Sequence, residues 1–599
     1  MKKYIIIFIF FLFFIILNRN VFASNDFNIN LNSSYSFNDN GISDVSDTFE
    51  IENRNTENYL PSFEYTIKNI TVYDIKVVEN GKELKYSQTN ENQATTIKVN
   101  FFDKILGKGK KRIFKITYTI SDISVRTGDI REVSIPKIEN IDAYQSINLT
   151  LFIPKSYGSE AYITPNYENK EIGSDYIKYI FNKNSLLASR VVAAYGEFQI
   201  FSFSINYHLS NNLSKGGTEN ISIPMDTSYQ RVVYNSIIPQ PKNIIIDSDG
   251  NWLAQYFVPS KSGFDVKVTG NVQLFAVPRK YLIPEVDNLY ENIKPSLYWE
   301  SGSDEIKAIS QKLINPEDVY KFVIETLNYD YSLLKKDRLG ALKSLKTTEK
   351  ITCREYSDLM ITILRAKGIP AREIIGYAYT DNPDIKPISF FNDVLHSWVE
   401  YWDINKNIWV SVDPTWGETS NSDYFNQFDL RHFAFTIHGK NSDLPLPPGS
   451  YSSNGYEKDI FINFGGKQEV SESPIIIENS NTLYFPLTRN INLNLKNNNN
   501  IALYEQNVKY YFDNKLVSED NYKVIPPLSF KNKRIPIRFS FLGSKTPDSI
   551  SVSINGKTTD FIGSKNTDTY SQLTVIFLFF ILIIVYISKN LIFYRKPSV

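Results

Sequence analysis

Alternating apolar and polar positions dominate the first half of the chain. From residue 25 to residue 140, short runs rich in Ile, Val, Tyr, Phe and Thr are separated by turn residues, and a similar texture continues over 141–285. A period of two places every second side chain on the same face of a strand. Asn80-Gly81 lies between two such runs, and Asn-Gly favours the positive φ angles of a tight hairpin. The pattern predicts an antiparallel β-sandwich module at 25–140 and a second β-rich module at 141–285.

The period changes to 3.6 residues near residue 301, which indicates helices. Ser303 stands where it can cap one helix, and Asn315-Pro316 has the residues preferred at the start of another. The Pro-rich run at 444–449 then ends this unit, because neither a helix nor a sheet continues through it. Strand-like segments return afterwards. We therefore expect a mixed α and β domain at 286–442 and a further β-sandwich module at 455–565.

The most strongly patterned helix begins at Cys353, the only cysteine of the chain. Thr352 and Glu355 have the spacing of a capping box, in which the two residues satisfy each other's free backbone N–H groups. Thr352 is therefore the expected N-cap and Cys353 the first helical residue. Apolar residues follow at helical spacing until Gly368, which leaves Cys353 off the apolar face and directs Asp358 outward.

A thiol at the start of a helix is a candidate nucleophile. Unpaired N–H groups and the positive end of the helix dipole both favour thiolate over thiol. A single cysteine cannot form a disulfide within the chain, and its structural alternative is a small buried hydrophobic residue. A thiolate that performs acyl transfer also needs a base. The chain offers four histidines, which are His208, His396, His432 and His438.

One of these histidines lies on a predicted β-hairpin. The segment from His396 to Trp402 alternates as a half-buried strand, and a return strand leads to Asp413. If Trp402 pairs with Asn407, His396 lies directly opposite Asp413, with Cβ atoms roughly 4.5 to 5.5 Å apart. This pairing favours a catalytic histidine over one that only fills the core. With the helix of Cys353 against the hairpin, the three residues would form a nucleophile, a base and an orienting acid.

These motifs resemble the transglutaminase-like superfamily, whose site is papain-like. The segments that carry the resemblance occur in the family's order and are CREYS at 353–357, LRAKGIPAR at 364–372, IGY at 375–377, HSWVE at 396–400 and WVSVDPT at 409–415. The resemblance covers residues 300–440. It implies an α+β transglutaminase-like core flanked by antiparallel β-sandwich modules, with Cys353 as nucleophile, His396 as general base and Asp413 as orienting acid. It implies no metal and no cofactor.

Two features near the cysteine are left open by the resemblance. The family usually has Gly two positions before the cysteine, where this chain has Ile351. The family also has a side-chain oxyanion donor upstream of the cysteine, and Tyr329 and Tyr331 are both candidates for it.

Two apolar segments frame the chain. Residues 1–23 combine Lys2 and Lys3 with a long apolar run and a small residue, Ala23, and so predict a signal peptide, with an uncleaved anchor as the alternative. Residues 573–594 are apolar and are followed by Arg595 and Lys596, which predicts one C-terminal transmembrane helix and a cytoplasmic tail at 595–599. The body of the protein would then lie outside the cell membrane.

The charge balance and the residues of one loop argue against two kinds of function, nucleic-acid binding and calcium binding. Lys plus Arg (65) equals Asp plus Glu (65), so the chain lacks the excess positive charge of a nucleic-acid-binding protein. The segment 247–251 resembles a calcium loop but lacks the downstream Glu, which favours a plain turn. The sequence thus predicts an exported, membrane-anchored thiol acyl-transfer enzyme acting on protein or peptide amides, by cross-linking or hydrolysis. The alternative is a catalytically inactive surface binding protein with the same fold; the sequence names neither the substrate nor the oligomeric state.

Overall fold

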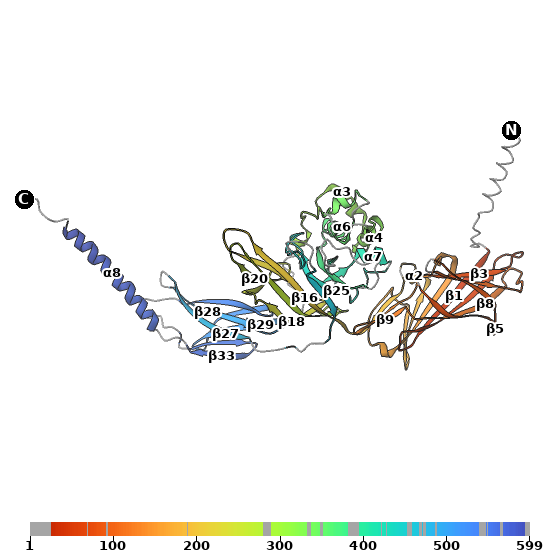
Figure 1. Cartoon of the computed structure of the whole chain (residues 1–599), viewed down its shortest axis with the longest axis horizontal. Coiled ribbons are helices and arrows are strands. Elements are labelled where there is room, and N and C mark those ends of the chain that lie inside the picture. The colour runs from red at the N-terminus through yellow and green to blue at the C-terminus, as the bar shows by residue number, and fades with distance from the viewer. Residues whose placement is uncertain are drawn as a thin grey trace, which may run out of the picture.

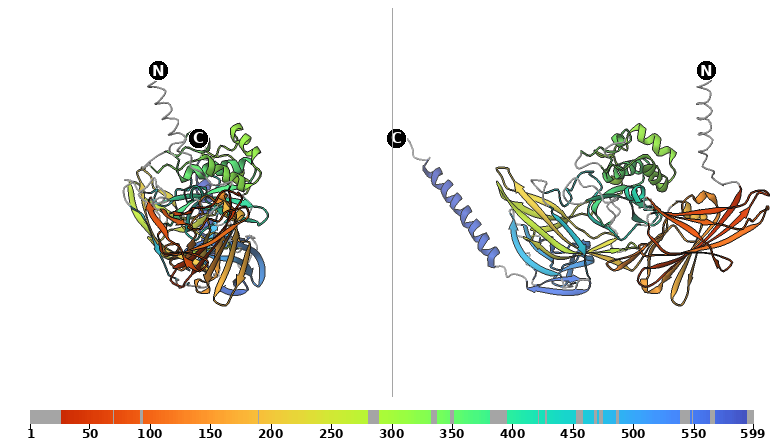
Figure 2. Two further views of the ribbon diagram at one scale, coloured as in Figure 1. Left: turned by 90° about the vertical axis from the view of Figure 1, so that its right-hand side faces the viewer. Right: turned by 45° about the vertical axis from the view of Figure 1, so that its right-hand side comes forward.

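The structure is a computed structural model that describes the chain except for residues 1–25, 69, 92–93, 189, 280–288, 332–336, 348–350, 381–394, 421, 427, 452–457, 467–469, 471–474, 485–487, 538–546, 548, 563–566 and 594–599. Its β-rich modules follow one another along an elongated molecule, and the helical domain lies on one side of the middle module (Figures 1 and 2). The predicted signal peptide, residues 1–23, lies outside the described residues.

The N-terminal module comprises residues 26–195. One sheet runs in the order β13-β14-β11-β1-β2-β8-β4-β5, a second β12-β15-β10-β9 and a third β3-β7-β6. The strands are β1 (Phe27–Phe37), β2 (Ser43–Asn53), β3 (Ser62–Lys68), β4 (Val72–Glu79), β5 (Lys82–Glu83), β6 (Tyr86–Glu91), β7 (Ala94–Asn100), β8 (Lys111–Ile120), β9 (Ser124–Thr127), β10 (Ile130–Ser134), β11 (Tyr144–Pro154), β12 (Glu160–Thr164), β13 (Asn169–Ile172), β14 (Tyr176–Asn182) and β15 (Val192–Tyr195), with the short helix α2 (Lys183–Ala188) after β14.

The module boundary expected between residues 140 and 141 is wrong. Strand β11 lies after that point, yet it pairs in parallel with β1. The pairing runs from Ile29 opposite Tyr144 to Ser36 opposite Phe152, and the two strands share one hydrophobic core. The alternating pattern identifies strands but does not say which strands share a sheet, because that depends on long-range pairing. The predicted hairpin turn is confirmed, since Asn80 and Gly81 have φ angles of 50° and 76° between β4 and β5.

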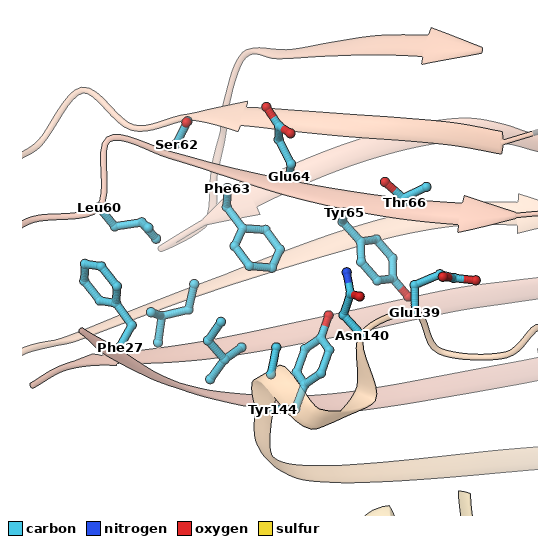
Figure 3. A pocket seen from close by; sticks show the side chains of 13 residues that line it. Phe27, Leu60, Ser62, Phe63, Glu64, Tyr65, Thr66, Glu139, Asn140 and Tyr144 are labelled. Atoms are coloured by element: carbon cyan, nitrogen blue, oxygen red, sulfur yellow. The ribbon is translucent and has the colours of Figure 1, made fainter. Parts of the chain in front are cut away.

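A cavity of about 410 Å³ opens along β3 in this module. Figure 3 shows the ring of Phe27 at one end, that of Phe63 in the middle, and the hydroxyl groups of Tyr65 and Tyr144 on the side of Asn140 and Glu139. All residues that line it belong to the N-terminal module, so the cavity is separate from Cys353 and the helical domain.

The middle β-module packs against the domain that contains Cys353. Its sheets run β18-β21-β16-β26 and β17-β20-β19. Its strands are β16 (Phe198–Asn211), β17 (Gly217–Ile223), β18 (Gln230–Ile238), β19 (Asn243–Ile246), β20 (Trp252–Val258), β21 (Ser262–Phe275) and β26 (Ile460–Phe464). Because β26 pairs with β16, the segment 460–464 does not belong to the C-terminal module expected at 455–565.

Two buried amide side chains join the middle module to strand β25 (His432–His438). Gln230 donates to the carbonyl of Ala434 at 2.9 Å and accepts from its N–H at 2.8 Å. Asn251 bonds Ile437 in the same way, at 2.8 and 2.7 Å. These bonds satisfy the outer edge of β25, which would otherwise present unpaired backbone groups.

The segment 247–251 is a turn in which Asp247 accepts two backbone N–H groups.

The helical domain contains α3 (Asp304–Lys312), α4 (Pro316–Thr326), α5 (Ala341–Ser344), α6 (Cys353–Ala366) and α7 (Pro414–Ser420). The two predicted caps are confirmed, because Ser303 accepts the N–H of Ile306 at 3.2 Å and Asn315 that of Asp318 at 2.9 Å. Helix α6 is buried on nearly all sides by the other helices and by the sheet.

The sheet of this domain runs β24-β23-β22-β25, with β22 (Ala371–Ala378), β23 (His396–Asp403) and β24 (Ile408–Val412). The predicted β23–β24 hairpin is present, but its register is not the expected one, since Trp402 pairs with Trp409 rather than Asn407. The turn lies one residue later in the chain. Asp403 accepts the N–H groups of Asn405 and Lys406 at 2.9 and 3.1 Å, and Asn407 has a φ of 56°.

The C-terminal module has sheets β27-β28-β31 and β30-β29-β32-β33. Its elements are β27 (Ile476–Tyr484), β28 (Thr488–Asn497), β29 (Leu503–Phe512), β30 (Lys515–Ile525), β31 (Ser529–Ile537), β32 (Ser549–Ile554) and β33 (Lys557–Ile562), followed by helix α8 (Thr567–Phe593). Within the described part of the chain, no helix meets the length and hydropathy of a membrane span. The transmembrane helix expected at 573–594 therefore has no support from the structure.

Candidate active site

Cys353 is the first residue of α6, as predicted, and only 4% of it is exposed. The capping box forms: the backbone N–H of Thr352 donates to Oε2 of Glu355 at 2.9 Å. Glu355 is itself buried and accepts the N–H of Leu339 through its other oxygen at 3.1 Å. The chain therefore enters the helix along a fixed path, and Cys353 lies in the first turn of α6.

His396 and Asp413 form a buried pair. The imidazole Nε2 lies 2.7 Å from Oδ2 of Asp413, and neither side chain is exposed. Burial alone would lower the pKa of His396, but the charge and hydrogen bond of Asp413, together with the thiol of Cys353, raise it to about 9. Nε2 is hydrogen-bonded to Asp413, and Nδ1 has no hydrogen-bond partner within the described part of the chain. Nδ1 is thus the nitrogen available to the thiol.

The position of Asp413 does not depend on the hairpin register that the sequence predicted. Pairing of β23 with β24 ends at Val399 and Val412, so His396 and Asp413 are not directly opposite each other. A register shift of two residues keeps each side chain on its predicted face, because the period of a strand is two. Asp413 can therefore still reach His396 from the end of β24.

Asp413 also caps helix α7. Its Oδ1 accepts the backbone N–H groups of Thr415 and Trp416 at 2.9 and 3.1 Å. Burial would raise the pKa of this carboxyl group, but the charge and hydrogen bond of His396, followed by those of His432, lower it well below its usual range. The carboxylate is thus ionised and fixed by the α7 backbone.

Aromatic rings enclose the imidazole. His396 stacks with Trp398, at a ring-centroid distance of 6.1 Å, and with Trp416, at 5.4 Å. Trp416 is fully buried. These rings exclude water from the His396–Asp413 bond and so strengthen it electrostatically.

A second histidine lies beyond Asp413. His432, at the start of β25, lies 3.1 Å through Nε2 from Oδ2 of Asp413 and 2.6 Å through Nδ1 from Oδ1 of Asp429. The motifs in the sequence do not single out these two residues. The signal available was the spacing Asp-x-x-His at 429–432, in a chain with four histidines.

His396, Asp413 and His432 also have the residue types of a metal-ligand set. Their nearest donor atoms lie within 4.8 Å of one another. Each of those atoms is already part of a hydrogen bond of 2.7 or 3.1 Å, which a cation would have to replace. The geometry is that of a hydrogen-bond network between rings and carboxylates.

The features left open by the sequence lie near the start of α6. Ile351 is completely buried in the helical core, and its carbonyl accepts the N–H of Asp330 at 2.9 Å. The ring of Tyr329 lies 4.8 Å from that of Tyr331 and 6.5 Å from that of Tyr356 on α6. Both tyrosines therefore stay candidates for the oxyanion donor.

Asp358, expected to point outward, is completely buried. It accepts Nε of Arg338 at 2.8 Å and Nε1 of Trp299 at 2.8 Å, and Arg338 also donates to Glu373 of β22 at 2.9 Å. Burial raises the pKa of Asp358, whereas Arg338 and Arg354 outweigh burial and lower that of Glu373. The periodicity of α6 could not show this, because the partner lies in a separate segment. The cluster joins α6 to the sheet behind the site.

Comparison with known proteins identifies part of the chain. Residues 303–414 match the model of the Transglutaminase-like superfamily. This chain contains a transglutaminase-like domain. The resemblance seen in the sequence motifs is confirmed for that domain.

The curated relatives share only short stretches with the chain. A protein-glutamine gamma-glutamyltransferase of Pseudomonas aeruginosa is 42% identical over 65 residues, which are 11% of this chain and 10% of that protein. The uncharacterised protein YebA of Bacillus subtilis is 29% identical over 172 residues, 26% of this chain and 22% of that protein. The chain thus matches about a tenth and about a fifth of the lengths of these relatives.

Solved structures resemble the chain distantly. A candidate cysteine protease from Cytophaga hutchinsonii aligns with 45% of this chain and 87% of its own, at 15% identity and a TM-score of 0.30. An M1 zinc metallopeptidase from Deinococcus radiodurans aligns with 34% of this chain and 46% of its own, at 10% identity and a TM-score of 0.19. At these TM-scores neither supports an argument about this fold.

Proposed function

We propose that this protein is a thiol acyl-transfer enzyme that acts on protein or peptide amides. The observation that carries the proposal is the buried His396–Asp413 pair at 2.7 Å, with Nδ1 of His396 left for the thiol of Cys353. A thiol, an imidazole and a carboxylate in this order are the parts of a nucleophilic triad. The transglutaminase-like match at 303–414 supports the same chemistry.

Each residue has one role in the proposed reaction. The Cys353 thiolate attacks the amide carbonyl carbon, and the C–N bond breaks as the His396 imidazolium gives its proton to the departing amine. A thioester to Cys353 remains. An incoming amine or water then attacks the thioester carbon and passes its proton to His396. The C–S bond breaks, so that the acyl product leaves and the thiolate and the imidazolium are restored. Asp413 keeps the ring oriented and stabilises its positive charge.

The high pKa of His396 suits this cycle. With a pKa of about 9, the ring is an imidazolium at neutral pH and can stabilise a neighbouring thiolate as an ion pair. The ion pair then reacts without a separate deprotonation of the thiol. The proposed enzyme therefore needs neither a metal ion nor a cofactor to generate its nucleophile.

The test uses the full-length chain, a glutamine-containing peptide and a labelled primary amine. Incorporation of the amine together with ammonia release indicates transfer, and ammonia release without incorporation indicates hydrolysis. Cys353→Ala is the matched control and should do neither. If the folded wild-type chain also does neither across a panel of amide donors, the proposed activity is wrong and a binding role replaces it.

Export of the body, with a cytoplasmic C-terminus, is proposed from the two apolar segments of the sequence alone. Protease added to intact cells, with any outer envelope opened, should digest residues 24 to about 570. A C-terminal tag should survive this treatment. Protection of the whole body would rule out export.

A further inference from the structure

His432 is a buried, charged side chain for which the proposed reaction has no role. Its ring is not exposed, and both nitrogens face carboxylate oxygens, Nδ1 that of Asp429 at 2.6 Å and Nε2 that of Asp413 at 3.1 Å. An ionised carboxylate can only accept a hydrogen bond. Both ring nitrogens must therefore carry hydrogens, which makes His432 an imidazolium.

This cation competes with His396 for the same oxygen atom. Oδ2 of Asp413 accepts Nε2 of His396 at 2.7 Å and Nε2 of His432 at 3.1 Å. The two rings are 5.5 Å apart between centroids. A like charge at that distance disfavours the charged form of its neighbour, and sharing the carboxylate weakens the attraction that favours it. Both effects make the His396 proton easier to remove.

Orientation of Asp413 does not require His432. The backbone N–H groups of Thr415 and Trp416 already fix the other carboxylate oxygen. Loss of the His432 charge would therefore leave the carboxylate in place and give it entirely to His396.

We propose that His432, held as a cation by Asp429, is a positioning residue that keeps Asp413 ionised and limits how tightly Asp413 holds the His396 proton. This inference rests on the proposed function, because it concerns the same triad. His396 must release its proton to the leaving amine in one step and regain a proton in the next. A base that holds its proton too tightly is a poor acid in the first step.

Other charged and titratable groups around His432 are paired with one another. Tyr424 donates to Oδ2 of Asp429 at 2.9 Å. Arg431 donates through its backbone to Oδ1 of Asp429 at 2.9 Å, and its guanidinium binds Glu132 of β10, with Nε 2.6 Å from Oε1. The remaining ring contacts of His432 are with Trp398, Trp416, Tyr424 and Phe428. Asp413, Asp429 and His396 are thus the groups whose charges act directly on the ring.

The test measures the His396 proton without any substrate. Because Cys353 is the only cysteine, the rate of alkylation of the full-length chain by iodoacetamide reports on this thiol alone. A thiolate–imidazolium pair gives two steps with pH, a lower one for thiolate formation and an upper one for loss of the imidazolium proton. In His432→Gln, the upper apparent pKa should rise by about one unit. An unchanged or lower value would overturn the inference.

Two further variants keep the test decisive. Asp429→Asn removes the carboxylate that holds Nδ1 protonated, so His432 becomes neutral and the upper apparent pKa should again rise. This variant decides the question if His432→Gln does not fold. His208→Gln is the control, since His208 is likewise bound by two aspartates, at 2.8 and 3.0 Å, but in the middle β-module, and should leave both steps unchanged.

The failure of the inference differs from that of the proposed function. A wild-type chain with a single alkylation step near the pKa of an ordinary thiol would overturn both. Two steps in the wild type that stay unchanged in the folded His432→Gln and Asp429→Asn variants would overturn only the role of His432.

Discussion

Asp413 bonds His396 through one carboxylate oxygen and caps helix α7 through the other. The first bond joins Oδ2 to Nε2 at 2.7 Å, and the second oxygen accepts two backbone N–H groups at 2.9 and 3.1 Å. One side chain therefore serves both the proposed chemistry and the fold. The two roles can be separated by substitution.

Asp413→Asn should keep the helix cap and lose the chemistry. An amide oxygen caps a helix as well as a carboxylate does, but an amide cannot stabilise the imidazolium of His396. We expect turnover to fall by about 10³- to 10⁴-fold. Stability should fall as well, because the buried rings of His396 and His432 lose the charge of their shared carboxylate. Asp413→Ala should lose the same activity and, in addition, about 1 kcal/mol of unfolding free energy from the cap. Steady-state kinetics and urea unfolding measure the two effects; equal stability of both variants would contradict the capping role.

Stability should decrease as the pH rises above neutrality. The pKa of His396 and that of His432 are each raised to about 9, whereas an unfolded histidine titrates near 6.5. Groups with a raised folded pKa contribute stability that is complete below about pH 6.5 and is lost as the pH rises through about 9. The melting temperature should therefore decrease as the pH is raised from about 6.5 to about 9. The decrease in melting temperature per pH unit should be smaller in His432→Gln than in the wild type. An equal decrease in both proteins would contradict the raised pKa of His432.

The buried cluster behind the site should be sensitive to loss of its cation. Arg338 is 3% exposed and binds both Asp358 and Glu373, which are fully buried. Arg338→Met removes the cation that Asp358 and Glu373 share and leaves the buried Asp358 without a charged partner, which should cost about 3–5 kcal/mol of unfolding free energy. Lys321→Met, which removes a surface ion pair with Glu317, is the matched control and should change stability by less than about 1 kcal/mol. Similar effects of the two substitutions on urea unfolding would show that the cluster is not needed for stability.

Ile351 should be needed for packing, although the family usually has Gly at this position. Its side chain is completely buried among the residues of the helical core. Ile351→Gly removes that packing and adds backbone freedom, so it should destabilise the protein by about 3–5 kcal/mol. It should not increase turnover per folded molecule, measured below the melting transition. A gain in turnover would mean that Ile351 impairs the site.

Local patterns in the sequence predicted local structure well. The capping box at Thr352, the caps at Ser303 and Asn315 and the turn at Asn80-Gly81 all form, because each depends on residues a few positions apart. The His396–Asp413 contact was also predictable, since an error of two residues in register preserves the face of a strand.

Long-range pairing could not be predicted in the same way. No local pattern indicates that β11 joins β1 in parallel, that β26 returns to β16, or that Arg338 buries Asp358. His432 reaches Asp413 for the same reason, because β25 pairs in space with β22, a strand that precedes the hairpin in the sequence. The network around the candidate site therefore extends beyond the motifs that located it.

The measurement that tests the central claim most directly is alkylation of Cys353 at about pH 5.5. An ordinary thiol, with a pKa near 8.5, hardly reacts there, whereas a thiolate paired with an imidazolium does. The wild-type chain should be alkylated at least about 100-fold faster than His396→Ala, because only the wild type has the His396 imidazolium to pair with the thiolate. Rates that are equal and slow in both proteins, with both folded, would contradict the assignment of Cys353 and His396 as nucleophile and base.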